Sequence, residues 1–189
     1  MTVDPYRSNR AFPSKTEVPS AGQLWRHVPM AQRLDAARAF WSDRDAAAQQ
    51  AEAVTEMARL LKFRPKSMQA LTIEKKVAHL ASLARLSDSV ASQVLVTYHL
   101  AAKRPMMRAF LDALGIAHED GVIAAPADLK APDAKQLEAA VQLLASQFSR
   151  EDVHLYLSTL LVQDPDTWGG LAGLLPGVIG AEAAGQPTP

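Results

Sequence analysis

The densest group of residues with metal-binding or acid–base chemistry is His118-Glu119-Asp120, which is followed by Asp128. Imidazole and carboxylate groups together suit several divalent ions, so these residues are a candidate metal site. Adjacent residues point their side chains in different directions, however, and the spacing matches neither a zinc site nor an EF-hand loop. The spacing therefore favours a solvated loop, and we expect no metal and no other cofactor.

Other sequence signatures of catalysis are missing. The chain has no cysteine, which excludes a disulfide framework, a thiol nucleophile and a thiolate zinc site. It also lacks a glycine-rich phosphate loop, a strained nucleophile elbow and a paired-histidine motif. Histidines such as His27 and His79 have no carboxylate at helical spacing to orient them as general bases. An enzyme is the least favoured class, although a site assembled only in space stays open.

Charge is strongly segregated along the chain, although the net charge is zero. Residues 1–58 contain seven basic and seven acidic residues. Residues 59–108 contain ten basic against two acidic residues, and residues 109–189 contain three basic against eleven acidic residues. A neutral chain has no global field that attracts nucleic acid or an acidic membrane. The segregation itself is therefore the feature that needs an explanation.

Three interpretations of the basic 59–108 segment stay open. In the first, its cations complete helix ends, where they complement the helix dipole. In the second, the basic and acidic portions fold against each other and their charges pair. In the third, a basic surface binds an anionic partner, either a nucleic acid or an acidic protein. The segment contains few aromatic residues for base stacking, which weighs against single-stranded nucleic acid.

We predict one exposed basic patch near the junction of two predicted helices, made of Lys62, Arg64, Lys66, Lys75 and Lys76. The last two lie in a predicted first helical turn, where a cation opposes the dipole at a cost of about 0.3–1 kcal/mol. Glu74 compensates this cost only in part. A residue placed against its local preference is more suggestive of function than one placed with it. The alternative is that Glu52, Glu56 or carboxylates of the acidic C-terminal portion neutralise the patch.

The elements that must position these residues are helices. Apolar residues recur at helical spacing, as in Met30, Leu34, Ala37 and Trp41, whereas strand signals are nearly absent. Residues 116–131 are expected to form a long loop. Helix boundaries are expected at the caps Ser42, Thr72, Ser87, Asp133, Ser149 and Asp164, at Pro105 and at Gly115. The sequence predicts an all-α fold, an irregular helical bundle of seven or eight helices, with two stacked three-helix units as one possible arrangement.

Composition and helix-breaking residues set the expected domain limits. Apolar residues make up 48% of the chain and charged residues 21%, which is typical of a globular protein. Residues 1–20 and 180–189 lack periodicity, so we predict disordered tails around a single helical domain at 21–179. No stretch approaches the ~20 apolar residues that span a bilayer. Without a secretory signal or cysteine, the sequence favours a cytoplasmic protein.

These features together favour a non-catalytic helical interaction or accessory protein that binds another protein or itself. The alternative is a nucleic-acid-binding protein that uses the basic 59–108 segment. A third class, an enzyme or metal protein centred on His118, Glu119 and Asp120, has the least support.

Overall fold

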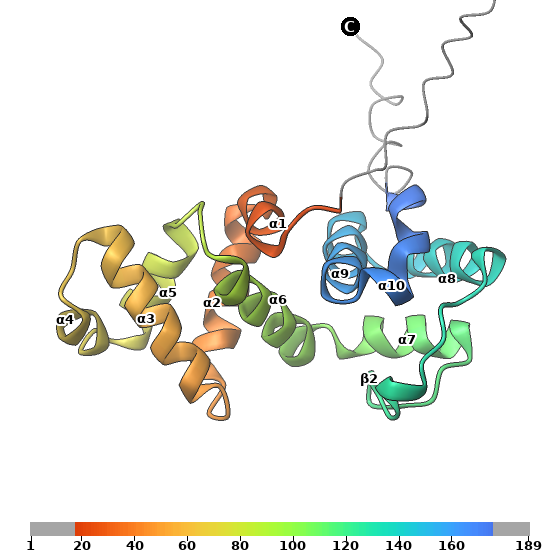
Figure 1. Ribbon diagram of the computed structural model, residues 1–189, viewed down its shortest axis with the longest axis horizontal. Helices are drawn as coiled ribbons and strands as arrows, with labels where there is room; N and C mark the ends of the chain where they lie inside the picture. Colours follow the sequence, from red (N-terminus) through yellow and green to blue (C-terminus); the bar gives the residue numbers. More distant parts are fainter. Residues whose placement is uncertain (1–17, 176–189) are drawn as a thin grey trace, which may run out of the picture.

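The computed structural model describes residues 18–175, which form ten α-helices and little else (Figure 1). In chain order the helices are α1 (Ala21–His27), α2 (Met30–Ser42), α3 (Ala47–Leu61), α4 (Pro65–Gln69), α5 (Ile73–Ser82), α6 (Asp88–Ala102), α7 (Arg104–Leu114), α8 (Ala134–Gln147), α9 (Arg150–Gln163) and α10 (Pro165–Trp168). Between α7 and α8 lie a hairpin of two short strands, β1 (His118–Glu119) and β2 (Val122–Ile123), and a 3-10 turn, η1 (Pro126–Asp128). A second 3-10 turn, η2 (Gly169–Gly173), follows α10. The predicted all-α class is confirmed.

Five of the ten helices begin at the predicted caps. In each of these first turns a backbone N–H donates to the side chain of the capping residue, which is Thr72, Ser87, Asp133, Ser149 or Asp164. Gly115 ends α7 in the left-handed conformation, with φ of 67°. The predicted cap at Ser42 is wrong, because Ser42 is the last residue of α2 and α3 begins after Ala46 without a side-chain cap.

The N-cap residue of α1, Ser20, lies within the segment that the sequence assigns to the N-terminal tail. The Gln23 N–H donates to the Ser20 hydroxyl at 3.3 Å, and the Ser20 N–H donates to the Gln23 side chain at 2.7 Å. These two bonds form a capping box, so Ser20 belongs to the fold. Residues 1–17 of the predicted N-terminal tail, and the whole predicted tail at 180–189, lie outside the described residues. The predicted domain at 21–179 extends four residues beyond them.

Two short helices, α1 and α4, raise the number of helices above the expected seven or eight. Each is held by a buried side chain. Trp25 of α1 is fully buried and its indole N–H donates to the Leu83 carbonyl at 2.7 Å. Met68 of α4 is also fully buried. Helices of two turns or fewer are too short for an apolar period to show in the sequence, and this is why both were missed.

The buried apolar side chains form two clusters. The first is built mainly by α1–α6 and the second by α7–α10 with η2. Helix α9 contributes to both, because Leu155 packs in the first cluster while Tyr156 and Leu157 pack in the second. Figure 1 shows α3, α4 and α5 at one end of the molecule, α7 and α8 towards the other, and α6 and α9 between them. The two clusters are unequal and differ from a pair of three-helix units.

No helix within residues 18–175 has both the length and the apolar character needed to cross a membrane.

Helix α1 docks closely against the start of α6 through Gly22. The Gly22 N–H donates to the Asp88 carboxylate at 2.8 Å, and a Cβ at position 22 would lie 2.6 Å from the Leu86 carbonyl oxygen. We expect Gly22→Ala to lower the free energy of unfolding by about 1–3 kcal/mol, because the backbone must shift to relieve this overlap. Gly173→Ala is the matched control, since a Cβ there meets no atom within 4 Å. Equal urea midpoints for the two variants would contradict the proposed close packing.

Candidate functional site

The five residues of the predicted basic patch lie at the end of the molecule formed by α3, α4 and α5 (Figure 1). Short-range sequence features end one helix and begin the next at this end of the molecule. Helix α3 ends as Lys62 adopts the left-handed conformation, with φ of 58°. Pro65 begins α4, and burial of Met68 holds this helix against the core. Thr72 then caps α5. These turns bring the five cations to the same end of the molecule.

The patch residues differ in exposure. Lys62, Arg64, Lys66 and Lys75 are exposed. Lys76 is half-buried, and its Nζ lies 5.6 Å from the centre of the Trp41 ring. This cation–π contact joins α5 to α2 and gives Lys76 a role within the fold.

Within residues 18–175, none of the five patch residues takes part in an ion pair. The neighbouring carboxylate of Glu56 is engaged elsewhere, because it accepts hydrogen bonds from the backbone N–H and the hydroxyl of Ser87. Glu52 is exposed on α3 and forms no ion pair with the patch. Among residues 18–175, no carboxylate therefore forms an ion pair with the patch.

The cations at the C-terminal end of the basic segment behave differently. Lys103 Nζ lies 2.8 Å from the Asp152 carboxylate. Arg104 and Arg108 both reach Asp120, with N–O distances of 3.6 and 3.5 Å. The basic and acidic portions thus fold against each other at this end. Within the basic 59–108 segment, Lys103, Arg104 and Arg108 are thus paired, whereas the five patch residues, Arg59 and Arg85 form no ion pair among residues 18–175.

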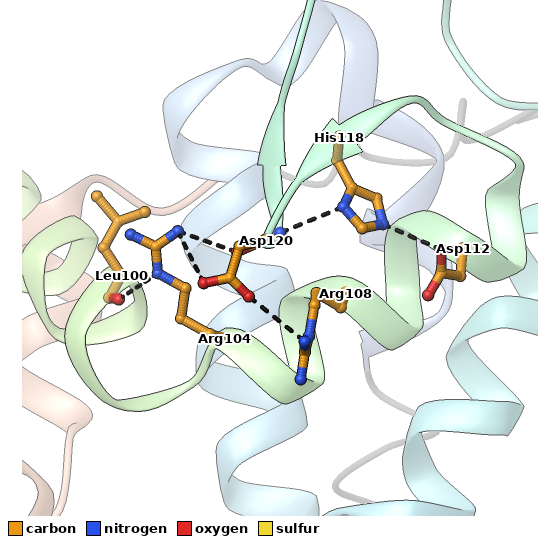
Figure 2. Close-up of polar contacts among 7 residues, drawn as sticks. Leu100, Arg104, Arg108, Asp112, His118 and Asp120 are labelled. Atoms are coloured by element: carbon orange, nitrogen blue, oxygen red, sulfur yellow. Dashed lines mark hydrogen bonds and ion pairs between the residues drawn. The ribbon is translucent and has the colours of Figure 1, made fainter.

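The His118-Glu119-Asp120 group forms a hairpin that closes on α7 (Figure 2). The Gly121 N–H donates to His118 Nδ1 at 3.3 Å, and His118 Nε2 lies 3.1 Å from the Asp112 carboxylate. Because Nδ1 accepts a hydrogen bond, the proton of the neutral ring is on Nε2, which donates to Asp112. Both ring nitrogens of His118 therefore make contacts within the hairpin and to α7.

Asp120 turns towards Arg104 and Arg108, away from the ring of His118 (Figure 2). The candidate metal site is therefore not assembled. Among residues 18–175, no three His, Asp or Glu side chains are placed to hold a metal ion. The predicted long loop at 116–131 also needs correction, because it contains a β-hairpin in which His118 pairs with Ile123.

A cavity of about 300 Å³ lies under this hairpin. Its apolar lining includes Ile116, Ile123 and Leu129, and its polar lining residues, Asp128 and Lys130, are exposed. Ligand sites need a few buried polar groups that fix the orientation of the ligand. The lining of this cavity provides none.

A polar network that the sequence did not indicate lies where α6 and α9 meet. The Thr159 hydroxyl donates to the Leu155 carbonyl at 2.7 Å, so it accepts from His99 Nε2 at 3.2 Å. His99 is 3% exposed, and its Nδ1 has no hydrogen-bond partner in the described structure. Burial, and then the nearby charge of Lys103, lowers the pKa of His99 to about 3. A single histidine within a helix does not indicate, from the sequence, that its ring is buried and hydrogen-bonded in this way.

Asp152 belongs to the same seam between the two clusters. It follows the Ser149 cap at the third helical position, where a capping box would return a bond to the cap. Its carboxylate accepts from Gln32 at 3.0 Å and pairs with Lys103. Burial alone would raise the pKa of Asp152, but hydrogen bonds from Lys103 and Ser149 hold it below its usual value.

The chain matches no family model, and comparisons with curated proteins and with solved structures find no match. The described structure contains an all-α fold with one unpaired basic patch, a hairpin fastened to α7 and a buried polar seam.

The burial of His99 predicts that the folded protein becomes less stable at acidic pH. The unfolded chain protonates this ring below about pH 6.5, whereas the folded protein keeps it neutral down to about pH 3. Stability is therefore lost as the pH falls from about 6.5 towards 3. At about 1.4 kcal/mol per pH unit, this group accounts for about 2 kcal/mol between pH 6.5 and 5. His99→Leu should remove this part of the acid sensitivity in urea titrations.

Thr159→Val is the control for this measurement. It removes the hydroxyl partner of His99 but keeps the ring that titrates, so the acid sensitivity should persist. Equal pH dependence in the wild type and in His99→Leu would show that His99 does not control it.

Proposed function

We propose that the protein is a non-catalytic helical interaction protein that binds an anionic partner through the basic patch. One observation carries this proposal. Four exposed cations lie outside ion pairs within residues 18–175, at the end of the molecule formed by α3–α5. Three other cations of the same basic segment are paired with carboxylates. Exposed, unpaired cations gathered at one end attract anionic partners and orient their approach.

Helix dipoles do not account for the whole patch. Lys62 follows the last turn of α3, where a cation is favourable. Arg64, however, is the N-cap residue of α4, and Lys75 lies in the first turn of α5. A positive charge at a helix N-terminus opposes the dipole. These two cations are therefore placed at a local cost.

Lys62 carries a second local cost. It is one of two non-glycine residues with positive φ among residues 18–175. An L-residue in the left-handed region costs roughly 1–2 kcal/mol, and glycine is the usual residue at this position after a helix. Retaining a lysine where glycine would be more stable is consistent with selection for binding at the expense of stability.

Replacing the five patch residues by Ser should weaken partner binding by about tenfold or more, since exposed charge pairs contribute about 0.2–1 kcal/mol each. The melting temperature should change little, because four of the five make no ion pair or cation–π contact in the described structure. The measurement is retention of partners from a lysate of the protein's own host by tagged wild type and variant. Lost stability with unchanged retention would mean that the patch serves the fold.

A matched control removes five exposed cations elsewhere, namely Arg26, Arg44, Lys130, Lys135 and Arg150. It changes the net charge equally and should keep the partner. Nuclease treatment of the lysate separates the two classes of anion. For nucleic acid, the logarithm of affinity should fall against the logarithm of salt concentration with a slope of about −4 to −5. A flat salt response would exclude nucleic acid.

Lys62→Gly should raise the free energy of unfolding by about 1 kcal/mol, because glycine adopts the left-handed conformation without strain. The same variant should bind the partner more weakly, because one patch charge is lost. The free energy of unfolding, measured by urea denaturation, should thus rise, whereas the retention of the partner from the same lysate should fall. Higher stability with undiminished binding would remove Lys62 from the binding surface.

A further inference from the structure

An exposed aromatic side chain lies within the basic patch. Six large apolar side chains are exposed among residues 18–175, namely Val18, Met30, Phe63, Ile73, Val122 and Leu143. Phe63, which is 42% exposed, is the aromatic member of this group, and it lies between Lys62 and Arg64 in the chain. Ile73, which is 50% exposed, precedes Lys75 by two residues.

Phe63 is fixed in place although it is not buried. Its backbone N–H donates to the Ala58 carbonyl at 2.8 Å, which closes the C-terminus of α3 after the left-handed residue. Its ring lies beside His79 of α5, with ring centres 5.7 Å apart. A side chain held in an exposed position loses little conformational freedom when a partner covers it.

The ring contact also connects Phe63 to the cations of α5. Lys75 and His79 are four residues apart on this helix, so they share a face. Phe63 packs beside His79 and therefore lies next to the face that carries Lys75. Ile73 is three residues from Lys76, so these two residues are neighbours on the surface of α5. The surface thus combines apolar contact area with surrounding positive charge.

We infer that the anionic partner is an acidic protein segment with apolar side chains, one of which packs on Phe63; this rests on the proposed function. Aromatic residues and arginine are enriched at protein interfaces, where an apolar centre is surrounded by a polar rim. Carboxylates on the partner complement the cations around the ring. Binding of single-stranded nucleic acid uses several aromatic platforms in succession. Among residues 18–175, Phe63 is the one aromatic side chain that is exposed.

Three synthetic probes of similar charge test this inference by fluorescence anisotropy. They are a Glu/Leu amphipathic helical peptide of about five turns, a polyglutamate peptide and an oligothymidine. The wild-type protein should bind the Glu/Leu peptide about tenfold more tightly than polyglutamate, because only the former has an apolar anchor. Phe63→Ser should reduce the affinity for the Glu/Leu peptide to the level of polyglutamate. Phe63→Leu should retain most of the affinity.

Leu143→Ser is the matched control, because Leu143 is 39% exposed on α8, away from the patch. It should bind all three probes like the wild type. Equal affinity for the two peptides, or unchanged binding in Phe63→Ser, would overturn the apolar anchor while leaving the basic patch as a binding surface. Tighter binding of oligothymidine than of the Glu/Leu peptide would assign the patch to nucleic acid. Failure of all three probes to bind would overturn the proposed function as well.

Discussion

Helix α9 is buried on both sides, and the relative placement of the two hydrophobic clusters depends on this burial. Seven of its side chains are buried. Leu155 packs among the helices of the first cluster, whereas Tyr156 and Leu157 pack in the second. Each large apolar side chain buried in this way stabilises the structure by about 1.5–3 kcal/mol. A helix shared by both clusters prevents them from moving apart without exposing apolar surface, and it fixes which polar groups meet at the seam.

Polar contacts at this seam and at the nearby hairpin pair three of the ten cations of the 59–108 segment with carboxylates. Lys103 follows α6 and meets Asp152 in the first turn of α9, where Gln32 also donates to the same carboxylate. Nearby, the hairpin after α7 closes through Arg104 and Asp120. These groups are partly buried or held against another element, so their charges are balanced within the fold. The cations at the C-terminal end of the basic segment are thus part of the contacts that hold α6–α9 and the hairpin together.

The patch cations, at the N-terminal end of the basic segment, make fewer contacts within the fold. Apart from Lys76, which contacts Trp41, the patch cations are exposed on α3–α5 and their connections. Their chain positions are set by buried anchors such as Met68, so the charged side chains are not themselves needed to fold this end. Surface charges of this kind contribute little to stability. These cations and the exposed ring of Phe63 make up the surface through which we propose that a partner binds.

The sequence by itself determined the all-α class and most helix boundaries, because caps such as Thr72 and Asp133 act within a few residues of the chain. It also indicated that the residues of the predicted patch lie near one another in the chain, at 62–76, where short turns connect α3, α4 and α5. Only the tertiary structure decided that Lys103 is paired while the patch is not, that His118 fastens a hairpin, and that His99 is buried without a full set of partners. Each of these depends on which distant elements pack together, and pairwise charge and burial energies act across space without regard to sequence separation.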